Sequence, residues 1–144
     1  DTLAAVGLTQ YEVSNFARAG QESRHNLRYW RRDHYHGFGL GAHSFLGDER
    51  FANSRDMHRY LAAPGVPDFH ETLGQAEQRR ETIFLNLRQA AGIQSDELVR
   101  LCGQEGIEWI DQGLEGGWLR RNGSRVAFTA GGFLLSSEYI SQLF

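Results

Sequence analysis

The chain has 144 residues, a length typical of one domain, or of one domain with part of another. Its 15 basic residues are all arginine and stand against 18 acidic ones, a formal net charge of −3, which argues against nucleic acid or an anionic membrane as the main partner. The single cysteine, Cys102, excludes an internal disulfide and a cysteine-only metal site and fits a reducing, cytoplasmic compartment.

The start of the chain carries no signal segment, and no run of about 18 apolar residues that could cross a membrane occurs anywhere. Because residue 1 is not methionine and residues 1–8 resemble the end of a helix that runs into a strand, we expect a part of a longer protein. Residues 9–16 alternate polar residues with Tyr11 and Val13, which predicts a half-buried strand.

Short elements are predicted for the rest of the first half. Ser23 is a favoured cap for a short helix after it, although that helix would have no clear apolar face. Residues 36–47 alternate glycine with apolar residues and predict a glycine-rich strand. A short helix is expected over 54–63, capped by Ser54 or Asn53. Both prolines of the chain lie in residues 63–70, which predicts a linker.

The second half is dominated by helical periodicity. Helices are predicted over 72–92 with Gly92 as the stop and over 95–106 with Ser95 as the cap, and a third helix or helical turn over 107–117. Asn122-Gly123 between two alternating runs predicts a hairpin, and residues 133–144 predict a closing helix. Three helices, a hairpin and a helix are the order of a winged-helix-like module. Leu98, Leu101 and Cys102 are expected to face inward. The other apolar residues near helical spacing are Leu73, Ala76, Ile83, Leu87, Ala90 and Ala91 in the first helix and Leu135, Tyr139, Ile140 and Leu143 in the last.

Several residue patterns resemble known sites without matching them. His34 and His36 could share one side of an extended segment, but the six histidines do not have the spacing of a closed zinc site. The third glycine of "GFGLG" comes too early for a dinucleotide-binding loop. Cys102 lies on the apolar side of a predicted helix and is expected in the core rather than as a nucleophile.

The stretch "SRHNLRYWRR", residues 23–32, is the most informative one for function. His25 could supply an imidazole to an iron centre, and on a helix Tyr29 would share its face. The neighbouring arginines could pair with carboxylates of a flat ligand such as a porphyrin. From the residues alone, a patch that holds loops or domains together is an equally good interpretation.

These residues also carry a family resemblance. "YEVSNFARAGQESRHNLRYWRRDHYHGFGLGAHSFLG", residues 11–47, resembles the oxygen-independent coproporphyrinogen III oxidase family of radical S-adenosylmethionine proteins, and "HNLRYW" is similar to the His-Asn-x-x-Tyr-Trp motif of its heme-chaperone branch. The resemblance implies a fold of α/β plus α+β type, with the C-terminal end of a partial (β/α) barrel over 1–62, a linker over 63–70 and a winged-helix-like domain over 71–144.

The same resemblance implies specific ligand-binding residues. His25, Asn26, Tyr29 and Trp30 match the heme motif, with His25 as the only residue implied to bind a metal, the heme iron. Phe16 and Ala17 match a pair that lies near bound S-adenosylmethionine. The family's three-cysteine motif for a 4Fe-4S cluster is absent, so this chain alone is expected to be inactive as an enzyme, with no catalytic residue assigned. Leu40 and "TAGG" depart from the family's "GPGAHS" and "TPEG".

Three functional hypotheses follow. The first is a fragment of a heme chaperone that binds heme and delivers it to an acceptor protein, with S-adenosylmethionine and the cluster held by the full-length parent. The second is an oxygen-independent coproporphyrinogen III dehydrogenase, which acts on the propionates of a porphyrinogen. The third is a nucleic-acid or protein interaction module, against which the lack of a basic stripe argues. An opened barrel would expose strand edges and apolar surface, so association, to a homo-oligomer for example, or partial disorder in residues 1–60 is also expected.

Overall fold

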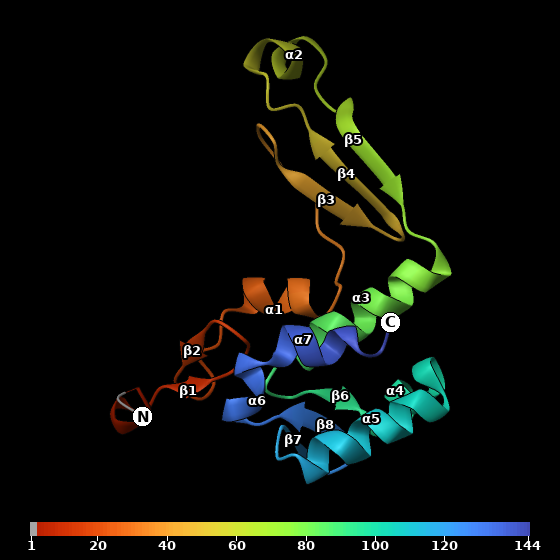
Figure 1. Cartoon of the computed structure of the whole chain (residues 1–144). Helices are drawn as coiled ribbons and strands as arrows, with labels where there is room; N and C mark the ends of the chain where they lie inside the picture. The colour runs from red at the N-terminus through yellow and green to blue at the C-terminus, as the bar shows by residue number, and fades with distance from the viewer. Residues whose placement is uncertain (1–2) are drawn as a thin grey trace. The chain divides into compact units, whose positions relative to one another are not determined.

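A computed structural model describes residues 3–144 and shows a mixed α/β chain that divides into two compact units (Figure 1). The first unit contains the residues up to Arg31 together with Arg80–Phe144, and the second contains Arg32–Arg79. This division differs from the expected one, in which residues 63–70 separate the two parts.

The first unit begins with a short hairpin and a helix. A 3₁₀ turn, Ala4–Val6, is followed by β1, Thr9–Gln10, and β2, Phe16–Ala17, which pair antiparallel. The predicted single strand over 9–16 is therefore wrong, because the chain turns back where the Tyr11 amide donates to the Asn15 carbonyl at 3.1 Å.

The short helix predicted after Ser23 is confirmed. Helix α1 spans Arg24–Trp30, and the hydroxyl of Ser23 accepts a hydrogen bond from the amide of Asn26. This cap satisfies one of the amides that a helix leaves unpaired at its start. None of the seven residues of α1 is buried, as the absence of an apolar face predicts.

The rest of the first unit has the predicted winged-helix-like order, with a three-stranded antiparallel sheet in the order β6-β8-β7. The hairpin at Asn122-Gly123 is confirmed as β7-β8. The elements are α3 Gln75–Leu87, which begins in the second unit, β6 Ile93–Gln94, α4 Ser95–Cys102, α5 Gln104–Glu115, β7 Leu119–Asn122, β8 Arg125–Phe128, α6 Ala130–Leu134 and α7 Ser136–Ser141.

Helix ends in this part differ from the predictions. The helix expected over 72–92 ends at Leu87, because the following residues turn into β6. Ser95 is the first residue of α4 rather than its cap. The closing helix expected over 133–144 is two short helices, and the first starts at Ala130 because the hydroxyl of Thr129 caps it by accepting from the Gly132 amide at 3.0 Å.

One hydrophobic core holds the first unit together. Leu98 is fully buried, and Leu101 and Cys102 pack against the core from the same helix, as predicted. Trp109 on α5 and Tyr139 on α7 connect the two helices by a pair of hydrogen bonds. The indole N–H of Trp109 donates to the Tyr139 carbonyl at 2.8 Å, and the Tyr139 hydroxyl donates to the Trp109 carbonyl at 2.9 Å. The buried core residues are Ile83, Leu87, Ile93, Leu98, Trp109, Ile110, Leu119, Val126, Phe128, Phe133, Ile140 and Leu143.

The second unit is a three-stranded antiparallel sheet in the order β3-β4-β5 with one short helix. Its elements are β3 His43–Leu46, β4 Glu49–Asn53, α2 Met57–Ala62 and β5 Pro67–Thr72. Residues 63–70, expected to be a linker, thus include most of β5. Helix α2 is capped by Asp56, whose carboxylate accepts from the Arg59 amide, and not by Ser54 or Asn53.

The glycine-rich stretch over 36–47 is a strand only at its end. Gly39 and Gly41 have φ angles of 100° and 63°, a region that a regular strand does not visit. The side-chain amide of Asn53 fixes this loop by donating to the carbonyls of Gly37 and Gly39 at 3.2 and 2.9 Å. The predicted strand is therefore wrong before residue 43.

Candidate functional site

The heme-motif residues lie on the exposed helix α1. The hydroxyl of Tyr29 lies 3.1 Å from Nε2 of His25, and the two rings meet edge to face with their centroids 4.9 Å apart. Both residues are exposed, whereas Asn26 and Trp30 are half-buried. A helix places residues i and i+4 on one face, which is why the spacing predicted this pair.

The end of α1 is attached to the core by one side chain that the sequence did not single out. The side-chain amide of Gln89 donates to the backbone carbonyl of Trp30 at 3.2 Å. Gln89 itself is 7% exposed. The contact joins residues 59 positions apart, so no local pattern could have revealed it.

The arginines of the predicted cluster do not act as one group. Arg24, Arg28 and Arg31 are exposed on or next to α1. Arg32 instead belongs to the second unit, where its guanidinium lies 5.0 Å from the centroid of the Phe45 ring. Burial lowers the pKa of Arg32 from its ordinary value.

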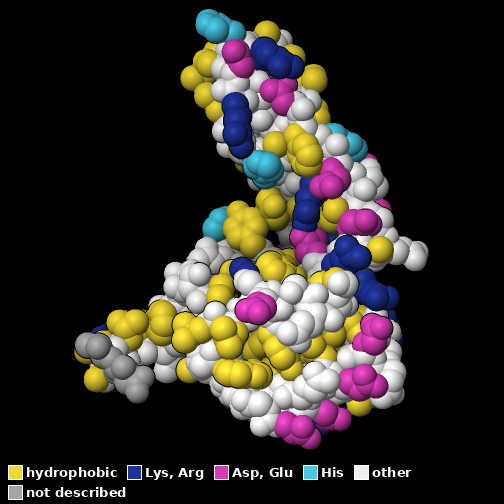
Figure 2. All heavy atoms as spheres, in the orientation of Figure 1, with side chains coloured by type: hydrophobic (Ala, Val, Ile, Leu, Met, Phe, Trp, Pro, Cys, Tyr) yellow, Lys and Arg dark blue, Asp and Glu magenta, His cyan; other side chains and the backbone are white. Residues whose placement is uncertain are grey.

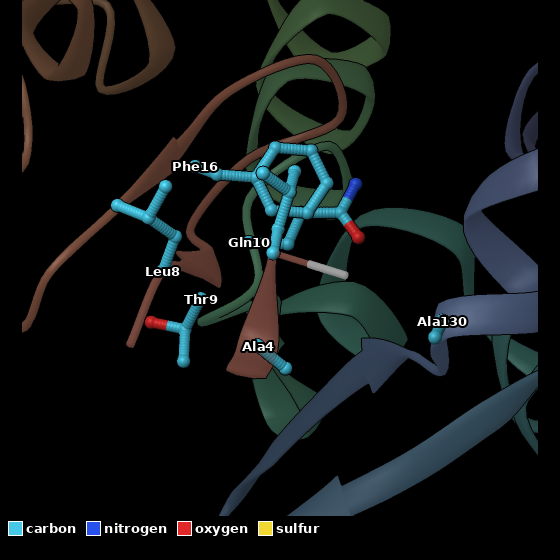
Figure 3. Close-up of a pocket in the computed structure, with 7 residues that line it drawn as sticks. Ala4, Leu8, Thr9, Gln10, Phe16 and Ala130 are labelled. Atoms are coloured by element: carbon cyan, nitrogen blue, oxygen red, sulfur yellow. The ribbon is translucent and has the colours of Figure 1, made fainter. Parts of the chain in front are cut away.

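Phe16 lies at a separate, mostly apolar pocket of about 490 Å³ (Figure 3). Phe16 faces Gln10 across the β1-β2 hairpin, and Figure 3 shows their side chains next to each other. Ala17 is 8% exposed, and its carbonyl accepts from the hydroxyl of Thr9. The pocket is lined by Leu3, Ala4, Leu8, Thr9, Gln10, Phe16 and Ala130. Figure 2 shows hydrophobic side chains gathered on the surface in the region of β1 and β2.

A buried charge supports the hairpin that carries Phe16. Glu12 is fully buried, and its carboxylate accepts a hydrogen bond from the amide of Ser14 at 3.1 Å. Burial lowers the pKa of Arg88, and the Glu12 charge opposes this shift. The Arg88 guanidinium lies 4.1 Å from the centroid of the Phe84 ring and donates to the hydroxyl of Ser137. The sequence indicated the burial of Glu12 only through its position as a charged residue in the alternating run of residues 9–16.

The structure thus brings His25 and Tyr29 together and places Phe16 at a pocket to which none of the four heme-motif residues contributes. Among residues 3–144 no group of three or more His, Cys, Asp or Glu side chains could hold a metal ion. Within the same residues no helix is long and apolar enough to cross a membrane.

The residues present do not fit a 4Fe-4S cluster of the family's three-cysteine type. Cys102 is the only cysteine of the chain and packs against the hydrophobic core. A thiolate cluster needs several cysteines around one centre, so no chemistry through such a cluster can be assigned to these residues.

Comparisons with known proteins agree with the resemblance. No protein-family model matches the sequence. The chain is 38% identical to the heme chaperone HemW of Bacillus subtilis over 94% of its own length and 35% identical to that of Lactococcus lactis over 96%. It spans 38% of the length of either relative.

A solved structure shows the same fold. The coproporphyrinogen III oxidase HemN of Escherichia coli, described as a radical SAM enzyme, superposes with a TM-score of 0.71 over 99% of this chain and 38% of its own, at 15% identity. The mixed α/β fold expected from the resemblance is thereby confirmed. The chain therefore belongs to the HemN/HemW family of radical S-adenosylmethionine proteins, and it corresponds to a part of the length of the relatives it matches.

Proposed function

We propose that this chain is the heme-binding part of a cytoplasmic heme chaperone, in which His25 binds the iron of a heme cargo that is then passed to an acceptor protein. The observation that carries the proposal is the exposed His25–Tyr29 pair on α1 within a matching His-Asn-x-x-Tyr-Trp motif. The relatives named heme chaperones, which align with nearly the whole chain, support it.

The local chemistry suits this cargo. Imidazole nitrogen is a common axial ligand of heme iron, and a helix without buried residues leaves one side open to a large flat molecule. Arg24 and Arg28 lie next to His25 in the sequence or one turn from it, and both are exposed. Their guanidinium groups can pair with the two propionates of heme, which fixes its orientation.

S-adenosylmethionine is proposed as a ligand of the parent protein near Phe16 and Ala17. The exposed Phe16 ring at an apolar pocket offers a surface on which an adenine can stack, and Gln10 and Thr9 add polar groups. A 4Fe-4S cluster would be held by a part of the parent outside these residues. Without that cluster we expect no reductive cleavage of S-adenosylmethionine by this chain.

Hemin titration followed by the Soret band tests the heme proposal. We expect saturable one-to-one binding by the 144-residue chain and at least tenfold weaker binding by His25→Ala, since a lost axial ligand removes the main specific contact. His58→Ala is the matched control, because His58 is another exposed helical histidine. Equal binding by the wild-type chain and His25→Ala would overturn the proposal.

A second titration tests the S-adenosylmethionine proposal. Calorimetry with S-adenosylhomocysteine should show binding that Phe16→Ala abolishes and Phe38→Ala retains, since Phe38 is 85% exposed and belongs to the second unit. Binding that is unchanged in Phe16→Ala would remove this residue from the site.

The alternative functions receive less support. The likeness to HemN at 15% identity shows the fold alone. It therefore gives no support to the dehydrogenase reaction itself. Helix α5 carries Glu105, Glu108, Asp111 and Glu115 and no basic residue, and Figure 2 shows acidic side chains in this region. Such a helix repels phosphates, which disfavours nucleic-acid binding.

Self-association remains a proposal based on exposed apolar surface. Leu3, Val6 and Phe16 are 43%, 57% and 43% exposed at the N-terminal end of the chain. Exposed apolar groups that lie together favour contact with another surface. Light scattering should show a mass above that of one chain, and a strictly monomeric sample at high concentration would contradict the proposal.

A further inference from the structure

Hydrophobic burial explains the position of α1 only in part, because its apolar residues Leu27 and Trp30 are half-buried and none is fully buried. The helix has seven residues, none of them buried, and a helix of this length is unstable in isolation. Its first turn is capped by Ser23, a local contact that does not attach it to the rest of the unit. Contacts at its other end can therefore help to set its direction.

Gln89 provides such a contact. Its side chain donates to the carbonyl of Trp30, the last residue of α1, and also to the carbonyl of Leu85, at 3.2 and 3.4 Å. Both partners are acceptors, so the amide nitrogen rather than the oxygen must point toward them. The last carbonyls of a helix have no partner within the helix, and Gln89 satisfies one of them.

The backbone holds Gln89 rigidly for this role. On one side of Gln89, the carbonyl of Arg88 accepts a hydrogen bond from the Val13 amide at 2.9 Å. On the other side, the amide of Ala90 donates to the Tyr11 carbonyl at 3.0 Å. Gln89 itself pairs with the buried Glu12 in an antiparallel bridge. The segment 88–90 therefore supports both the hairpin that carries Phe16 and the helix that carries His25.

We infer that Gln89 is a positioning residue for heme binding, since it fixes the C-terminal end of α1 and thereby the direction in which His25 faces the cargo. The inference rests on the proposed function. A helix released from Gln89 populates several orientations, and the apparent affinity falls by the fraction that remains competent to bind. Gln89 is not a heme ligand, because its side chain is buried and its amide nitrogen donates to the backbone carbonyls of Trp30 and Leu85.

The test compares Gln89→Leu and Gln89→Glu with the wild-type chain. Leucine keeps an apolar body of similar size without a donor, and glutamate keeps the shape but places an acceptor against the Trp30 carbonyl. We expect both variants to bind hemin roughly fivefold more weakly, the factor that corresponds to one ordinary neutral hydrogen bond. The Soret maximum of the saturated complex should stay unchanged, because His25 remains the ligand. Gln112→Leu, at an exposed site on α5, is the control.

Hydrogen exchange provides a readout independent of heme. In the absence of hemin, the amides of residues 27–31 should exchange faster in Gln89→Leu than in the wild-type chain, whereas those of α5 should not change. Equal exchange together with equal hemin affinity would overturn the inference. Faster exchange throughout the core would also overturn it, because Gln89 would then act on global stability.

His25→Ala, measured in parallel, separates the two proposals. If His25→Ala binds hemin as the wild-type chain does, the proposed function fails, and exchange in α1 alone decides whether Gln89 anchors the helix. If His25→Ala loses binding but the Gln89 variants do not, the proposed function holds and the positioning role is wrong.

Discussion

The hydroxyl oxygen of Tyr29 lies 3.1 Å from Nε2 of His25, one turn earlier on α1. This contact uses a nitrogen that heme iron would need, so iron can bind at Nε2 only after the Tyr29 hydroxyl has moved away. The two rings also meet edge to face, a contact that does not depend on the hydroxyl.

Tyr29→Phe should therefore bind hemin more tightly than the wild-type chain. Phenylalanine keeps the ring contact and removes the competing hydroxyl, which should raise the affinity by a factor of about five, the typical worth of one hydrogen bond. Soret titration of both proteins measures the ratio. A loss of binding as large as that of His25→Ala would instead show that the hydroxyl contacts the cargo.

The buried Glu12 and the half-buried Arg88 should stabilise the fold together, since the Glu12 charge opposes the lowering of the Arg88 pKa by burial. Arg88→Met should lower the free energy of unfolding by about 1–3 kcal/mol, because it leaves the buried Glu12 carboxylate without the nearby positive charge. Glu12→Gln should lower it by less, because the half-buried Arg88 keeps its contacts with Phe84 and Ser137. The double variant should lose about 1 kcal/mol less than the sum of the two. Urea unfolding measures all four proteins, with Glu115→Gln on the exposed face of α5 as the control. Simple additivity would show that the two charges do not interact.

Local signals predicted much of this structure, and contacts between distant residues account for what they missed. Ser23 and the Asn122-Gly123 turn act within a few residues, so α1 and the β7-β8 hairpin could be predicted. The alternation over 9–16 resembles one strand, because nothing in a period of two encodes the turn that folds it into β1 and β2.

The candidate site shows the same division. The spacing of His25 and Tyr29 predicted their contact, since helix geometry alone brings them together. The support of α1 by Gln89 depends on the packing of a segment 59 residues away. Likewise, Pro64 and Pro67 indicated a linker, but proline is compatible with the first position of an edge strand, and Pro67 starts β5.

Tyr139 should make stability depend on pH in the alkaline range. Burial raises the pKa of its phenol above the ordinary value of about 10. Between the two pKa values the unfolded chain binds fewer protons than the folded one, so this contribution is complete below about pH 10 and is lost as the pH rises through the raised pKa.

Tyr139→Phe provides the measurement. At pH 8 it should be less stable by about 1 kcal/mol, because the hydrogen bond to the Trp109 carbonyl is lost. The difference from the wild-type chain should narrow above pH 10, where the other tyrosines contribute equally to both proteins. If the stability difference between the two proteins stayed constant from pH 8 to pH 11, the raised pKa of Tyr139 would be contradicted.

Gly92 and Gly123 make a matched pair that tests the packing at the start of the winged-helix sheet. Both have a left-handed backbone, with φ angles of 69° and 60°. A methyl group at Gly123 would meet nothing within 4 Å, whereas one at Gly92 would overlap the carbonyl oxygen of Val126 and lie 2.7 Å from Cα of Ala127. The two positions thus share the backbone strain and differ in space.

Gly123→Ala should lower the free energy of unfolding by about 1 kcal/mol, the cost of a left-handed non-glycine residue. Gly92→Ala should lower it by about 2–4 kcal/mol, because overpacking against β8 is added to the same strain. Urea unfolding of both variants measures the difference. Equal losses of unfolding free energy in the two variants would contradict this prediction. They would mean that β8, where Val126 pairs with Ile93, can move away from residue 92.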